Sequence, residues 1–202
     1  MKKALLLILT FAGMAMVQSV FATHIKAVSM HYNCVAGDTL EMNVVQQQDC
    51  GGLLPSPGLV QFTGVGPGCT PPAQINSWTI KTSVDVTPVC AGVVTNCTSP
   101  GMGVAGYAER IFSTEYDFSS ATCTQYEARW SLCCRQPTTS YSHSPADIIL
   151  DGVMIDLSNT PCNNSPQFIN PPTMWLCSGV DAVFENQTYD PDGDSLVYRI
   201  ID

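Results

Sequence analysis

Three aspartates alternate near the end of the sequence, in the stretch "DPDGDSL". Asp190, Asp192 and Asp194 stand two positions apart, and Gly193 favours a tight turn that brings their carboxylates together. Crowded carboxylate oxygens suit Ca²⁺, and without a cation these like charges would repel one another. Together with the nearby Glu185, these residues predict a calcium site. The alternative is an Asx-rich turn with solvated side chains, which needs no metal.

Cysteine is the second residue type that could do chemistry. The ten cysteines are Cys34, Cys50, Cys69, Cys90, Cys97, Cys123, Cys133, Cys134, Cys162 and Cys177. An even number of cysteines in an exported chain predicts disulfides, whereas zinc would favour C-x-x-C pairs, and none occurs. Short separations along the chain favour three pairs, namely Cys34–Cys50, Cys90–Cys97 and Cys162–Cys177.

Residues that could catalyse a reaction are scattered rather than grouped. The three histidines, His24, His31 and His143, lack the spacing of metal ligands. No G-x-S-x-G motif marks a serine nucleophile, and cysteines that are oxidised in disulfides cannot act as nucleophiles. We therefore predict no catalytic residue, no enzyme activity and no cofactor other than calcium.

The N-terminus has the three parts of a secretory signal peptide. Lys2 and Lys3 precede an almost wholly apolar run over residues 4–17, and residues 20–22 form a cleavage site of the A-x-A type. The apolar run is too short to span a bilayer, and no later segment is long and apolar enough to do so. Residues 1–22 are thus predicted to be removed, which places the mature chain outside the cell or on its surface, with no transmembrane segment.

Charge excludes one class of partner. The sequence carries a formal net charge of −9, and the signal contains two lysines and no acidic residue, so the mature chain is at −11. Such a surface repels nucleic acid, which binds through basic side chains. We therefore expect no nucleic-acid partner.

Alternation of apolar and polar residues is the main structural signal. In "SWTIKTSVDV" one predicted face holds Trp78, Ile80, Val84 and Val86. In "QYEARWSLCC" the inward face holds Tyr126, Ala128, Trp130 and Leu132. Apolar residues at every second position predict half-buried antiparallel strands, and no stretch keeps helical spacing over three turns. The predicted fold is all-β: a disulfide-stapled antiparallel β-sandwich-like domain, followed by the start of a second immunoglobulin- or cadherin-like β unit.

The Pro-rich segment "SPQFINPP" predicts a linker and a domain boundary near Asn170. Residues 23–169 would form the Cys-rich β domain, and residues 170–202 the truncated start of an immunoglobulin-, PKD- or cadherin-like domain. After the aspartates, alternation over residues 196–201 predicts a strand with no partner after it. We therefore expect the natural polypeptide to continue into further β repeats.

Six segments occur in an order that resembles a known group of proteins. They are "THIKAVSMHYNC", "QQQDCGG", "VTPVC", "QYEARWSLCCR", "PCNNSPQF" and "LCSGVDAVFENQTYDPDGDSLVYRI". Together they resemble the N-terminal region of large secreted or cell-surface proteins of gliding Bacteroidota-type bacteria. Those proteins carry PKD-like or other immunoglobulin-like repeats and a gliding-motility-associated C-terminal sorting domain. The resemblance implies an adhesive or structural role at the cell surface, and it supplies no catalytic residues.

These observations predict a non-enzymatic extracellular or cell-surface module for structure or adhesion, rigidified by disulfides and by calcium if it binds. Its partner would be an extracellular surface ligand, either a polysaccharide or a protein. The alternative is a carbohydrate-binding or targeting module of a secreted hydrolase. The chain beyond residue 202 would separate these functions, because repeats favour an adhesin and a catalytic domain favours the hydrolase.

Overall fold

A computed structural model describes residues 25–52, 57–132, 149–158, 163–169, 179, 181, 183, 185 and 187–199. The predicted signal peptide, His24, His143 and four cysteines (Cys133, Cys134, Cys162 and Cys177) lie outside the described residues. Within the described part, the chain forms strands and no helix. It therefore contains no helix long and apolar enough to cross a membrane.

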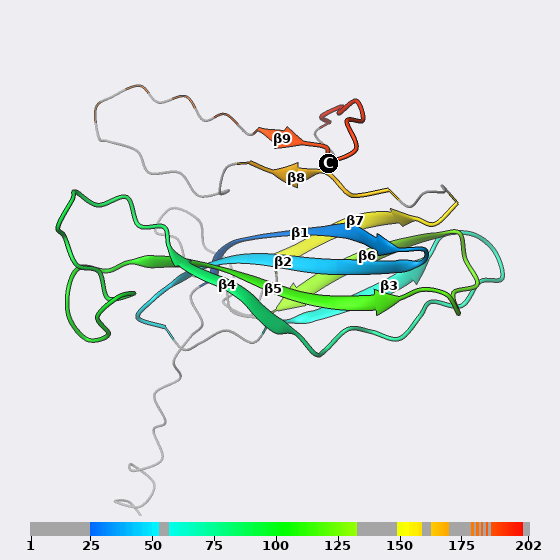
Figure 1. Ribbon diagram of the computed structural model, residues 1–202, viewed down its shortest axis with the longest axis horizontal. Coiled ribbons are helices and arrows are strands. Elements are labelled where there is room, and N and C mark those ends of the chain that lie inside the picture. Colours follow the sequence, from blue (N-terminus) through cyan, green and yellow to red (C-terminus); the bar gives the residue numbers. More distant parts are fainter. Residues whose placement is uncertain are drawn as a thin grey trace, which may run out of the picture.

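Two antiparallel sheets make up the body of the molecule (Figure 1). The first sheet has the order β1-β2-β5-β4, with β1 Ile25–Ala36, β2 Thr39–Asp49, β5 Tyr107–Asp117 and β4 Thr79–Asp85. The second sheet has the order β3-β6-β7, with β3 Leu59–Gly64, β6 Gln125–Leu132 and β7 Ile149–Asp156. A separate pair joins β8, Gln167–Phe168, to β9, Thr188–Tyr189.

The core lies between the two sheets, because each strand places alternate side chains on its inner face. The first sheet contributes Leu40, Met42, Val44 and Phe112 to the core. The second sheet contributes Val60, Phe62, Tyr126, Ala128, Trp130 and Ile155. The indole N–H of Trp130 donates to the Pro57 carbonyl at 2.7 Å, so its one polar atom is satisfied in the interior. The predicted disulfide-stapled β-sandwich is confirmed.

Strand β4 corrects one prediction about faces. Ile80 and Val84 were expected to point inward together, but their side chains are 51% and 57% exposed. The register with β5 shifts between Ile80 and Thr82, so Ile80 lies opposite the core residue Phe112 whereas Val84 lies opposite Glu109. A bulge of this kind reverses the faces that follow it, which simple alternation cannot anticipate.

Residues after the linker also depart from expectation. No strand occurs over the described residues 190–199, where the sequence predicted one from residue 196, and Val197 is 79% exposed. A strand requires a neighbour for its backbone hydrogen bonds, and no described segment pairs with these residues. Strands β8 and β9 lie on opposite sides of the predicted boundary at Asn170 and pair with each other. The division into two domains stays a prediction.

Candidate functional site

The aspartate loop is closed by its own first side chain. Asp190 Oδ1 accepts the backbone N–H of Asp192 at 2.8 Å and that of Asp194 at 3.3 Å. The N–H of Gly193, at φ 83°, donates to the Asp190 carbonyl at 3.2 Å. These bonds are those of an Asx-type turn, in which the carboxylate organises the backbone.

Asp192 instead holds a distant part of the chain. Its carboxylate accepts the backbone N–H of Asn164 at 2.6 Å and the Asn164 side-chain amide at 2.8 Å. Asn164 Oδ1 in turn accepts the Cys34 N–H of strand β1 at 2.8 Å. The loop is therefore fastened to residues 163–169, and these residues are fastened to the edge of the first sheet.

The three aspartates share one turn, but the structure does not gather their oxygens with those of Glu185. Glu185 accepts a hydrogen bond from the Gln187 side chain at 2.6 Å. Among the described residues, no group of three or more His, Cys, Asp or Glu side chains is placed to hold a metal ion. The geometry therefore matches the Asx-turn alternative, and calcium binding stays a prediction.

The disulfides differ from the pairs that short separation favoured. Cys50 is bonded to Cys97 and Cys69 to Cys123, with sequence separations of 47 and 54. The predicted pairs Cys34–Cys50 and Cys90–Cys97 are therefore wrong. Cys34 is in a disulfide, and its partner cysteine lies outside the described residues. Both cysteines of the predicted pair Cys162–Cys177 also lie outside the described residues, so that pair stays a prediction. The Cys90 thiol is free and exposed.

Strand pairing explains both observed bonds. Cys50 directly follows β2 and Cys97 precedes β5, and these two strands are hydrogen-bonded neighbours. Cys69 follows β3 and Cys123 precedes β6, which are neighbours in the second sheet. Each disulfide thus joins the connections at the end of a strand pair. Separation along the chain carries no information about this proximity, because it comes from the topology of the sheets.

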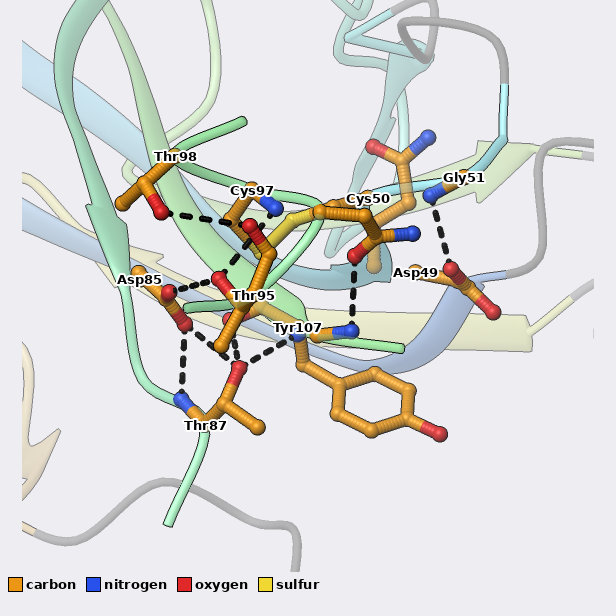
Figure 2. The surroundings of a disulfide bond; sticks show 12 residues. Asp49, Cys50, Gly51, Asp85, Thr87, Thr95, Cys97, Thr98 and Tyr107 are labelled. Atoms are coloured by element: carbon orange, nitrogen blue, oxygen red, sulfur yellow. Dashed lines mark hydrogen bonds between the residues drawn. A yellow bond between two sulfur atoms is a disulfide. The ribbon is translucent and has the colours of Figure 1, made fainter. Parts of the chain in front are cut away.

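A polar cluster lies beside the Cys50–Cys97 bond, and the Asp85 carboxylate is a shared acceptor within it (Figure 2). The Asp85 carboxylate accepts hydrogen bonds from the hydroxyls of Thr87 and Thr95 and from the Thr87 N–H, the last at 3.0 Å. Burial alone would raise the pKa of Asp85, but these hydrogen bonds outweigh burial and lower it. Asp85 therefore stays ionised at neutral pH.

Both threonine hydroxyls connect Asp85 to the backbone. The Thr87 hydroxyl accepts the Tyr107 N–H at 2.8 Å, and the Thr95 hydroxyl accepts the Cys97 N–H at 3.2 Å. The Asn96 side chain accepts the Gly106 N–H at 2.7 Å. The connection between β4 and β5 is thus held by the same group of residues that includes the disulfide.

A hollow of about 350 Å³ opens beside this disulfide. Its walls include Ser83 and Asp85 from β4, Ala108 and Arg110 from β5, and residues 96–98 of the connection. Arg110 is half-buried, its Nη1 donates to Gln48 Oε1 at 2.7 Å, and burial lowers its pKa. The hollow therefore combines one guanidinium and one carboxylate with hydroxyl and amide groups.

Comparison with protein-family models, curated proteins and solved structures finds no significant match for this chain. Resemblance to surface proteins of gliding bacteria accordingly stays a prediction, and the hollow is interpreted from its own geometry. Sequence reasoning missed Arg110 and Ser83 as site residues, since no motif links positions so far apart. They meet because β4 and β5 pair with Ser83 opposite Arg110. Only the strand register could have revealed this.

Proposed function

We propose that this protein is a non-enzymatic module that works outside the cell, on the cell surface or in its surroundings, in structure or adhesion. The observation that carries the proposal is the pair of disulfides that fasten long connections to an antiparallel sandwich. Disulfides persist in oxidising compartments and are rare in the cytosol. The signal peptide predicted from residues 1–22 agrees with such a location.

Order in the connections supports this role. Residues 86–106 join β4 to β5 without forming a strand or helix, and connections of this length are normally either functional or disordered. Here Cys97 anchors the connection to Cys50, while Thr87 and Thr95 anchor it to Asp85. A surface of fixed shape at the end of a stiff sandwich suits a module that presents contacts to a partner.

A second candidate function is binding of a saccharide, either for adhesion or for targeting an attached hydrolase. The polar hollow at Arg110 favours it, because sugars require a small concave site with several hydrogen-bonding groups. Both candidates place the module outside the cell, and they differ in whether this hollow takes a ligand.

Surface proteolysis tests the extracellular proposal. The full-length protein should be degraded by protease added to intact cells of its host, and a cytosolic marker protein should survive. Natively purified protein should also resist thiol-specific labelling at most of its cysteines until it is reduced. Protection of the protein in intact cells together with mostly free thiols would contradict the proposal. Loss of attachment in a deletion strain, measured by counting cells retained on glass under flow, would separate adhesion from a purely structural role.

A further inference from the structure

We propose that the hollow beside Cys50–Cys97, the Arg110 hollow, binds a sugar unit that carries a carboxylate, of the uronic acid class. Arg110 would recognise the carboxylate, and polar groups on the facing walls would bind ring hydroxyls. The inference rests on the proposed extracellular role, because acidic polysaccharides are met outside the cell. It adds a ligand class and a site to that role.

The Arg110 guanidinium has N–H donors that its described hydrogen bond does not use. It carries five N–H donors, and its hydrogen bond to Gln48 uses one of them. The ion pairs found within the described residues join Lys81 to Glu41 and Arg129 to Glu127, so no described carboxylate pairs with Arg110. A partly desolvated guanidinium without an anion is unfavourable, and a carboxylate fits its planar fork in a bidentate manner.

The neighbouring acidic side chains accept hydrogen bonds from residues other than Arg110. Asp85, on the wall of the same hollow, accepts three hydrogen bonds from Thr87 and Thr95, which fix its carboxylate within the β4–β5 connection. Glu109 accepts a hydrogen bond from the Gln47 side chain at 3.1 Å, and as the neighbour of Arg110 in β5 it belongs to the opposite face of the sheet. Arg110 is therefore the positively charged residue among the described walls of the hollow, and although the ionised Asp85 shares these walls, no described carboxylate pairs with Arg110.

The remaining walls match the rest of a sugar acid. Ser83 is exposed and lies opposite Arg110, and neither its hydroxyl nor the Asn96 Nδ2 makes a hydrogen bond within the described part of the chain. Pro100 is exposed on the wall of the hollow and provides apolar surface for a ring face. The volume is at the lower end of the range for small-molecule sites, which suits one sugar ring rather than a long segment of polymer.

Calorimetric titration of the oxidised, purified full chain tests the site with matched ligands. Galacturonate and glucuronate should bind, whereas galactose, which replaces the carboxylate by a hydroxymethyl group, and the methyl ester of galacturonate should bind at least about tenfold more weakly. An oligogalacturonide should also bind, which separates a polymer end or branch from a free sugar acid. Equal binding of galactose, absence of binding by every acidic sugar, or preference for an acidic peptide would overturn the proposal.

Two variants address the site in different ways. Arg110→Gln should weaken galacturonate binding at least about tenfold, whereas Arg129→Gln, at an exposed arginine paired with Glu127, should leave it unchanged. Ser83→Phe fills the hollow from the exposed strand β4 without altering Arg110, and it should abolish binding while circular dichroism stays that of the native protein. Retained binding in either hollow variant would refute the site. Surface proteolysis is independent of these titrations, so failure of the site and failure of the extracellular role are distinguishable.

Discussion

At the scale of single residues, Asp85 has more structural partners than its position at the end of an edge strand suggests. Its carboxylate is the common acceptor for two threonine hydroxyls, and each hydroxyl also accepts a backbone N–H from the other side of the cluster. Thr95 is buried, and Asp85 is the carboxylate that accepts the hydrogen bond from its hydroxyl. The β4–β5 connection therefore depends on Asp85 as a shared acceptor at its start.

Asp85→Ala should therefore destabilise the protein by about 2–4 kcal/mol, because it removes charge-assisted hydrogen bonds and leaves a buried donor unpaired. The measurement is urea unfolding at neutral pH followed by tryptophan fluorescence. Asp38→Ala is the matched control, since Asp38 is exposed in the β1–β2 turn, and it should change stability by less than about 0.5 kcal/mol. Equal effects of the two substitutions would show that the Asp85 cluster contributes nothing specific.

Glu41 gives the fold a dependence on acid. Its Oε1 binds the Lys81 ammonium at 2.7 Å, and its Oε2 accepts hydrogen bonds from Asn33 and Asn43. The hydrogen bond from Lys81 is the largest cause that lowers the pKa of Glu41, from 4.5 to about 2, despite burial, which raises it. A pKa that is lower in the folded state means that the ionised form stabilises the fold.

The contribution of Glu41 should be complete above pH 4.5 and should be lost as the pH falls from 4.5 toward 2. Glu41→Gln removes this titration, so the difference in unfolding free energy between wild type and variant should shrink across that interval. Urea denaturation at a series of pH values measures it. A difference that is constant with pH would mean that Glu41 has the same pKa in both states.

At the scale of elements, the disulfides act on strand pairs rather than on local loops. Removing Cys69–Cys123 by a double substitution to alanine should cost about 4 kcal/mol, because the bond closes a loop with a sequence separation of 54. Gly64 leaves the space that this disulfide occupies, because a Cβ at position 64 would lie 2.5 Å from Cys123 Sγ and 2.7 Å from Cys69 Sγ. Gly64→Ala should therefore destabilise the oxidised protein more than it destabilises the double alanine variant.

Peptide mapping without reduction checks the connectivity on which this prediction depends. Linked peptides should contain Cys50 with Cys97 and Cys69 with Cys123, and Cys90 should be alkylated before any reductant is added. Cys34 should be linked to a cysteine outside the described residues. Recovery of a Cys34–Cys50 peptide would contradict the described topology.

The contact of Asp192 with Asn164 should control how firmly residues 163–169 cover strand β1. Asp192→Ala removes both acceptors used by Asn164, so the amides of Asn164 and Cys34 should exchange with deuterium faster than in the wild type. Asp194→Ala, in the same turn, is the control, because only its backbone N–H is bonded in the described structure. The comparison is made in EDTA so that metal binding cannot contribute. Unchanged exchange at Cys34 would show that the covering segment is held by other contacts.

At the scale of the whole molecule, patterns that act locally were readable from the sequence, and patterns that depend on topology were not. Alternation placed Tyr126, Ala128 and Trp130 in the core, because β6 is a regular central strand with a neighbour on each side. The same reasoning was wrong for Val84, where a bulge reverses the face. The disulfide partners and the position of Arg110 depend on which strands become neighbours in the sheets. The spacing of residues along the chain does not reveal that strand order.

The two edge strands of the larger sheet, β1 and β4, affect whether separate copies of the protein can pair through their backbones. A bare edge strand invites the backbone of another molecule to pair with it, but β4 has a bulge and Lys81 at that position, and residues 163–169 cover part of β1 through Tyr32 and Cys34. When many copies are packed closely together, these protected stretches cannot pair with a straight strand of another copy, which is how fibrils grow. The bulge in β4, which reverses the face of Val84, therefore also protects this edge against pairing with other copies.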